Sequence, residues 1–448
     1  MTCLRNNNSN ADCARGKQMR CIAILLGLIL TTFYAKAEIR GEFQSKMSVG
    51  ESGINQFEHI TTPSFTYSGE NFRFYSEYRL RVDTADELEP GKFDEPTSSA
   101  FSKRMNLSGS AEFEIREFFV DGYLGEVFLK LGKQQIVWGQ SDGLRVLDVV
   151  NPLNYREFIL TGLDERRIPL WSASAEIGLG QWQLQTVWVP DQTYNYLPSG
   201  TNAPTFAFTS SLYIPSIQHA DQVVLKAPKT RGKIFNDSDF GFRLSTFTEN
   251  GWDIGVVYFY HYRDESVLYR EHVEEALIIQ PQFERSHLLG FSASNVLGDV
   301  ILRSEVGYST NVHYLTDWSV TQNDQHTSSE VAMVLGLDYQ GISNVFLTAQ
   351  IFASHINHFH HDIIREQTEY QYTMRYEQTF YNETWTLSLQ NIQSINREDG
   401  LLQLSLEHQY SSSIILSLGC DIFYGAQHGL FGQFKDKDRV SMALNYSF

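Results

Sequence analysis

Residues 439–448 read RVSMALNYSF, and apolar and polar side chains alternate along this stretch up to Phe448. Val440 and Met442 fall on one face of the pattern, whereas Arg439 and Ser441 fall on the other. A period of two residues is typical of a β-strand with one apolar and one polar face. The stretch therefore predicts a strand at the end of the chain.

The same alternation recurs in longer segments, for example residues 71–83 (NFRFYSEYRLRVD) and 251–263 (GWDIGVVYFYHYR). Strands of a β-sandwich also alternate, but globular strands are usually about 5–6 residues long. Long strands that are apolar on one side and charged on the other fit a barrel with lipid outside and water inside. Aromatic residues make up 13% of the chain, which suits the aromatic girdles of such barrels.

The connections between the expected strands alternate between short turns and longer segments. The longer ones fall around 85–103, 139–169, 191–237, 264–283, 312–327, 356–365 and 426–435. Outer-membrane barrels have short periplasmic turns and longer external loops. We therefore expect an all-β fold, a transmembrane antiparallel up-and-down β-barrel of about 18 strands (16–18). The segment 191–237 is expected to be a long extracellular loop.

The N-terminal region predicts export. Residues 21–34 (CIAILLGLILTTFY) are apolar, follow Lys17 and Arg20, and precede the small-residue motif AKA at 35–37. This pattern predicts a signal peptide over residues 1–37, with Met19 as a candidate true start, and it is too short for a spanning helix. An uncleaved anchor is the alternative. Residues 38–448 are then expected to form a single barrel domain.

Charge and cysteine content exclude several classes of protein. The formal net charge is −18, which argues against a nucleic-acid partner. Three of the four cysteines lie in the expected signal peptide, so only Cys420 remains and no intrachain disulfide is expected. The sequence holds no G-x-S-x-G, HExxH, Walker or GxGxxG motif, and we expect neither an enzyme nor a cofactor.

Residues 440–448 resemble the C-terminal signature of Gram-negative outer-membrane barrels, in which a terminal Phe follows alternating apolar residues. The resemblance implies a location in the outer membrane of a Gram-negative bacterium. It also implies recognition by the barrel assembly machinery and contact with outer-membrane lipid and lipopolysaccharide.

The block 129–158 (LKLGKQQIVWGQSDGLRVLDVVNPLNYREF) resembles a proteobacterial outer-membrane barrel family of largely unassigned function. The residues that carry the resemblance are Gly132, Lys133, Gln134, Trp138, Gly139, Asn151 and Pro152. It implies a porin-like barrel without an established substrate.

The loop 139–169 is the candidate constriction of the pore. Its run GLRVLDVVNP is too apolar to lie free in water, and the barrel lumen is the nearest surface on which it can pack. A loop packed over the rim, which only stabilises the barrel, is the alternative. The residues expected at the constriction are Trp138, Asp142, Arg145, Asp148, Asn151, Arg156 and Glu157.

Charged residues on the polar faces of the strands are expected to line the lumen. Opposed basic and acidic ladders would create a transverse field, although polar residues also serve to solvate a wide pore. The residues concerned are Arg73, Glu77, Arg79, Arg81, Glu112, Glu114, Arg116, Arg303, Glu305, Arg375 and Glu377.

Histidines gather in residues 354–362 (SHINHFHHD). His355, His358, His360 and His361 are the candidates for a metal site, but no closed four-ligand pattern is present and none is expected. They could instead form a pH-sensitive gate.

Together these features predict a channel through which small polar or charged solutes pass by passive diffusion. The alternative is a non-conducting barrel that binds a ligand, a lipid or an export partner through its extracellular loops. The sign of the charge selectivity stays open, because net acidity favours cations while Arg73, Arg79 and Arg81 favour anions.

Overall fold

The computed structural model describes residues 37–51, 53–85, 88, 96–141, 143–198, 205–210, 212, 222–229, 233–273, 276–318 and 325–448. All but the last residue of the expected signal peptide, and also Asp142, lie outside these residues. No helix within the described residues is long and apolar enough to cross a membrane.

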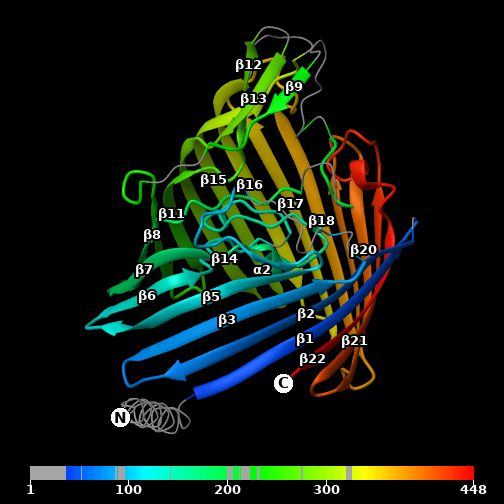
Figure 1. The fold of residues 1–448 in the computed structure, drawn as a ribbon. Coiled ribbons are helices and arrows are strands. Elements are labelled where there is room, and N and C mark those ends of the chain that lie inside the picture. Colours follow the sequence, from blue (N-terminus) through cyan, green and yellow to red (C-terminus); the bar gives the residue numbers. More distant parts are fainter. Residues whose placement is uncertain are drawn as a thin grey trace, which may run out of the picture.

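Eighteen strands form a closed antiparallel barrel, which confirms the predicted fold class. They are β1 (Ala37–Gly50), β2 (Gly53–Ser68), β3 (Phe72–Asp83), β5 (Ala111–Leu124), β6 (Val127–Gln134), β7 (Leu170–Leu179), β8 (Trp182–Val189), β10 (Asp239–Phe247), β11 (Asp253–Tyr262), β14 (Arg285–Leu297), β15 (Val300–Leu315), β16 (Gln325–Tyr339), β17 (Val345–Ile356), β18 (Thr368–Phe380), β19 (Trp385–Ser394), β20 (Asp399–Ser411), β21 (Ile414–Tyr424) and β22 (Arg439–Ser447). The last strand, β22, pairs with β1 and leaves no open edge at this seam (Figure 1).

The faces of the strands follow the alternation of the sequence. In β22, Val440 and Met442 lie on the outer surface and are 52% and 53% exposed. Arg439 lies on the inner face of the barrel and is 3% exposed. In β14, Leu289 and Phe291 are exposed and Leu288 is buried. A barrel in a bilayer needs an apolar exterior, and the exposed apolar side chains supply it.

The two ends of the barrel differ in their connections. One end carries tight turns such as 125–126, 180–181 and 298–299, as the periplasmic end of outer-membrane barrels does. The other end carries longer connections, which contain β4 (Met105–Ser108), α2 (Leu163–Arg166) and η1 (Gly432–Phe434). Only the connections at 51–52 and 395–398 are short at that end among the described strands.

A small second sheet rises above the outer end of the barrel (Figure 1). The strands β12 (Val267–Val273) and β13 (Ala276–Gln282) form an antiparallel hairpin, and β9 (Gln222–Leu225) pairs parallel with β13. β9 belongs to the connection between β8 and β10, so two external connections share this sheet.

Candidate functional site

The connection from β6 to β7, residues 135–169, runs through the inside of the barrel (Figure 1). Its apolar residues Val146, Leu147 and Val150 form one buried cluster with residues of the inner wall, which include Val257 of β11 and Leu288 of β14. The apolar run in this connection therefore packs inward, against the wall made by β8, β11, β14, β16 and β17.

Glycines in the wall strands make room for the loop. Gly290 of β14 and Gly307 of β15 are paired neighbours, and Leu147 lies over both. A Cβ atom at Gly290 would overlap Leu147 Cδ2, and one at Gly241 of β10 would lie 2.6 Å from Trp138 Cη2. Glycine inside a strand often marks such a close approach. Trp138 and Leu147 thus fill hollows that only glycine leaves open.

Two charged residues of β15 hold the loop backbone on the same wall. Glu305 is buried and accepts hydrogen bonds from the backbone N–H groups of Gln140 and Leu147, the latter at 3.2 Å. Arg303 donates to the carbonyl oxygen of Gln140 at 2.8 Å and forms an ion pair with Asp338. These contacts satisfy backbone groups that would otherwise be buried without partners.

Asn151 fixes the base of the loop. Its side chain is fully buried, accepts a hydrogen bond from the backbone N–H of Ile136 at 2.7 Å and donates to the carbonyl of Ile168 at 2.9 Å. Arg145 donates to the carbonyl oxygen of Asn151 at 2.7 Å. One amide side chain therefore joins the outgoing and returning halves of the connection.

The tip of the loop reaches the opposite wall through ion pairs. Arg156 contacts Glu58 of β2 at 2.6 Å. Glu157 contacts Lys46 of β1 at 3.2 Å and Arg439 of β22 at 3.0 Å. Burial alone would raise the pKa of Glu157, but the positive charges of Lys46, Arg439 and Arg156 outweigh it and hold this pKa below its usual range.

An aromatic cluster completes this second anchor. Phe158 is fully buried, and its ring centroid lies 4.7 Å from that of Phe434 in η1. Phe206, Phe423 and Phe431 belong to the same cluster. The loop is therefore fixed on the β11–β17 wall by its first half and on the β20–β22 side by its tip, and it crosses the lumen between them.

A cavity of about 1010 Å³ remains between the loop and the inner faces of β17 to β22 and β1. Half of the wall residues from these strands carry hydroxyl or amide groups: Gln44, Thr348, Thr373, Thr386, Ser388, Gln390, Gln403, Ser405, Ser417, Ser441 and Asn445. Charged residues also line it, among them Arg375 and Glu377, whose side chains pair at 2.5 Å. The cavity is thus polar and mostly uncharged along its strand wall.

The loop residues singled out from the sequence have different surroundings. Trp138, Arg145, Asp148, Asn151, Arg156 and Glu157 all belong to the inward connection, whereas Asp142 lies outside the described residues. Of these, Glu157 borders the cavity, and Asp148 instead pairs with Arg167 at 2.7 Å within the loop. Lys46, Glu58 and Arg439 were not singled out, although they hold the tip.

The predicted lumen residues have different surroundings. Arg81, Arg375 and Glu377 line the cavity. Arg79, Glu114 and Arg116 are buried beside the loop, and Arg116 donates to the carbonyl oxygen of Arg167 at 3.0 Å. Glu112 pairs with Arg81 and Arg104. Arg303 and Glu305 hold the loop backbone, Arg73 pairs with Asp121, and Glu77 accepts a hydrogen bond from Tyr75.

Comparisons with known proteins agree with this fold. Residues 65–448 match the family described as "Protein of unknown function (DUF1302)". The chain belongs to this family. The match spans the block 129–158 but does not show which of its residues define the DUF1302 family.

Two solved structures are similar to this DUF1302 protein. One is OccD3 (OpdP) of Pseudomonas aeruginosa, with a TM-score of 0.51 and 9% identity over 92% of this chain and 91% of that one. The other is OccAB4 of Acinetobacter baumannii, with a TM-score of 0.50 and 9% identity over 92% and 98%. No curated protein matches the sequence. The chain has the same β-barrel fold as these two proteins.

Proposed function

We propose that this DUF1302 protein is a porin-like channel for the passive diffusion or uptake of small polar or charged solutes, and that residues 135–169 form its constriction. The observation that carries the proposal is the polar cavity of about 1010 Å³ that the loop leaves against β17–β22. A loop that crosses a lumen and leaves one polar passage sets the size limit of a pore.

The pairing of charges suggests what kind of solute would pass. Lys46 and Arg439 balance the charges of Glu157 and Asp421 at the cavity wall, and Arg375 pairs with Glu377. Paired charges present little net field to a passing ion, whereas hydroxyl and amide groups replace the hydration of polar solutes. We therefore propose weak charge selectivity and a preference for small, well-hydrated polar molecules.

The proposed partners follow from the surface. The exposed apolar face, which includes Leu289 and Met442, would contact outer-membrane lipid and lipopolysaccharide. The barrel assembly machinery would recognise residues 440–448.

A second candidate function is a non-conducting barrel that binds a partner at its outer end. The external connection from β8 to β10 exposes large apolar side chains, among them Leu225, Ile234 and Phe235. Exposed apolar residues of this kind mark interaction sites when they form a continuous patch. Conductance separates the two functions, because only the channel requires an open passage.

The test is single-channel recording of the purified protein in planar lipid bilayers. Discrete openings are expected, and Ser388→Trp should reduce their amplitude because Ser388 faces the cavity. Leu389→Trp is the matched control, since Leu389 lies next to it on the exposed outer face. Absence of openings from folded protein would refute the channel function and leave the binding function.

A further inference from the structure

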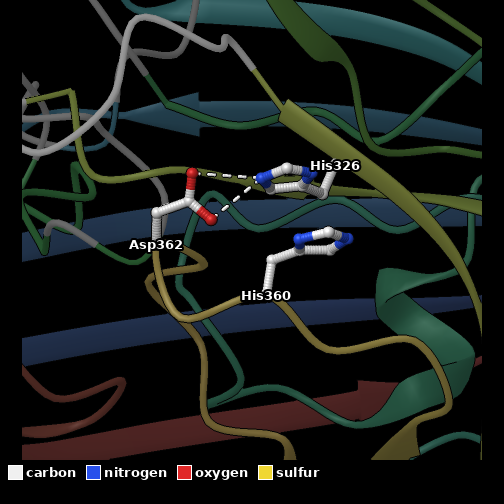
Figure 2. Close-up of side chains that lie close together, drawn as sticks. All are labelled: His326, His360 and Asp362. Atoms are coloured by element: carbon white, nitrogen blue, oxygen red, sulfur yellow. Dashed lines mark hydrogen bonds and ion pairs between the residues drawn. The ribbon is translucent and has the colours of Figure 1, made fainter.

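Three potential metal ligands meet at the outer end of the barrel. His326, His360 and Asp362 place one ligand atom each within 4.8 Å of the other two (Figure 2). His326 Nε2 lies 2.8 Å from Asp362 Oδ1, and the imidazole rings of His326 and His360 stack with their centroids 4.0 Å apart.

The fold brings these residues together from two separate segments. His326 is the second residue of β16 and pairs with Tyr314 of β15. His360 and Asp362 lie in the connection from β17 to β18, where the N–H of Ile363 donates to the carbonyl oxygen of His360 at 3.1 Å. The cluster therefore depends on the fold, because the histidine-rich sequence 354–362 supplies only His360 and Asp362.

The surroundings hold the two segments in place without any ion. The N–H of Asp317 donates to the carbonyl oxygen of Asp362 at 2.8 Å, and Thr316 forms a β-bridge with Ile363. A small apolar cluster, which includes Tyr314 and Ile363, packs at the same outer end. Asp362 is buried and His326 is half-buried, so two of the three ligands are well ordered by packing.

Two imidazoles and one carboxylate make a donor set for a particular class of ion. Imidazole nitrogen suits Zn²⁺, Cu²⁺ and Ni²⁺, whereas Ca²⁺ and Mg²⁺ require oxygen ligands. Zinc sites with three protein ligands keep a further position for water. We infer that His326, His360 and Asp362 bind a divalent transition-metal ion such as Zn²⁺, which links β16 to the β17–β18 connection at the external mouth.

The other histidines of the segment help to define the site. His355 donates to or accepts from Thr368 Oγ1 at 2.7 Å and is not part of the cluster. His358 and His361 are exposed in the same connection. Of the four histidines singled out from the sequence, only His360 belongs to the cluster. The second imidazole comes from His326, which lies far from them in the chain. This inference is independent of whether the barrel conducts.

The test uses the full chain without a histidine tag, purified in detergent and treated with EDTA. Isothermal titration with Zn²⁺ should show one site per chain, and His326→Ala and His360→Ala should each weaken binding by at least about tenfold. Asp362→Asn keeps the size of the side chain and should also weaken it. His355→Ala is the matched control and should bind as the wild type does, and Mg²⁺ should not compete.

A spectroscopic measurement distinguishes the loss of a metal ligand from a loss of protein stability. With Cu²⁺ as the probe, the EPR spectrum of the wild type should show superhyperfine coupling to two imidazole nitrogens, reduced to one in His326→Ala. Heat-modified migration in SDS gels confirms that each variant is a folded barrel. No saturable Zn²⁺ binding by the wild type, or binding as tight as that of the wild type in His326→Ala and His360→Ala, would overturn the inference.

Discussion

Leu147 offers the sharpest test of how the loop is held. Its side chain is fully buried and lies over Gly290 and Gly307, on the wall opposite the cavity. Leu147→Ala would leave an unfilled hollow between these glycines, because the strand backbone cannot collapse into it. The substitution therefore weakens docking of the first half of the loop without touching a charge or a residue of the cavity.

The expected size of the effect follows from the burial. Replacing a fully buried leucine by alanine costs about 2–5 kcal/mol, and about 3 kcal/mol is a fair central value here. Each 1.4 kcal/mol is a factor of ten, so the ratio of docked to undocked loop should fall by about a hundredfold. Because Arg156 and Glu157 still hold the tip, the loss should appear as movement of the loop within a folded barrel.

Single-channel recording provides the assay. Leu147→Ala should show larger or noisier openings than the wild type. Leu289→Ala is the matched control, because it makes the same change at an outward position that is 54% exposed, beside Gly290. A Leu147→Ala channel with the amplitude and noise of the wild type would refute the idea that this contact keeps the constriction in place.

Glycine substitutions test the same contact from the other side. A Cβ atom at Gly290 would overlap Leu147 Cδ2, whereas one at Gly307 would lie 3.4 Å from the same atom. Gly290→Ala should therefore displace the loop and Gly307→Ala should not, although the two glycines are direct partners. Equal conductance of both variants would show that the hollow at Gly290 is not needed for docking.

The remaining predictions concern charges. Glu157→Gln leaves Lys46 without its carboxylate partner and Arg439 with Asp421 alone. Breaking a buried ion pair costs about 3–5 kcal/mol, so the urea concentration at the unfolding midpoint should fall, and an unchanged midpoint would contradict the pairing. Loss of the negative charge should also make the channel more selective for anions, which the reversal potential measures. The pKa of Glu157 is held below its ordinary value of 4.5, so its stabilising charge is fully present above that pH and is lost only as the pH falls through the lowered value. Single-channel conductance of the wild type should accordingly be the same at pH 7 and pH 5, and a larger conductance at pH 5 would refute this. Arg375→Gln should make the channel more selective for cations, because Glu377 then loses its paired guanidinium, and the reversal potential should show this change. Its stability should change by less than about 1 kcal/mol, because the side chain of Arg375 is 46% exposed.

The barrel could be predicted from the sequence because its main physical cause is local. Each strand must turn apolar residues to lipid and polar residues to water, so a period of two is visible without knowing any partner. The ends of strands were predicted less accurately: the connection expected around 312–327 is shorter, because β15 continues to Leu315 and β16 begins at Gln325.

The loop could be predicted only in part. The apolar run around Leu147 indicated that it packs on something, and the structure shows it against the inner wall. The partners of its tip were not visible, because Arg156 and Glu58 are 98 residues apart and Glu157 and Arg439 are 282 apart. One available signal was missed: Gly290 and Gly307 lie inside otherwise well-formed strands, where glycine needs a reason.

The two anchors of the loop differ in kind, and the difference has consequences for the barrel itself. The first half is held by apolar side chains in hollows of strands in the middle of the chain. The tip is held by Lys46 of β1 and Arg439 of β22, the two strands that close the barrel. One carboxylate, Glu157, therefore bridges both sides of the closing seam. The double contact of Glu157 requires β1 and β22 to lie side by side, whereas the apolar anchor involves only the middle strands. The loop therefore connects the middle strands of the barrel to its closing seam.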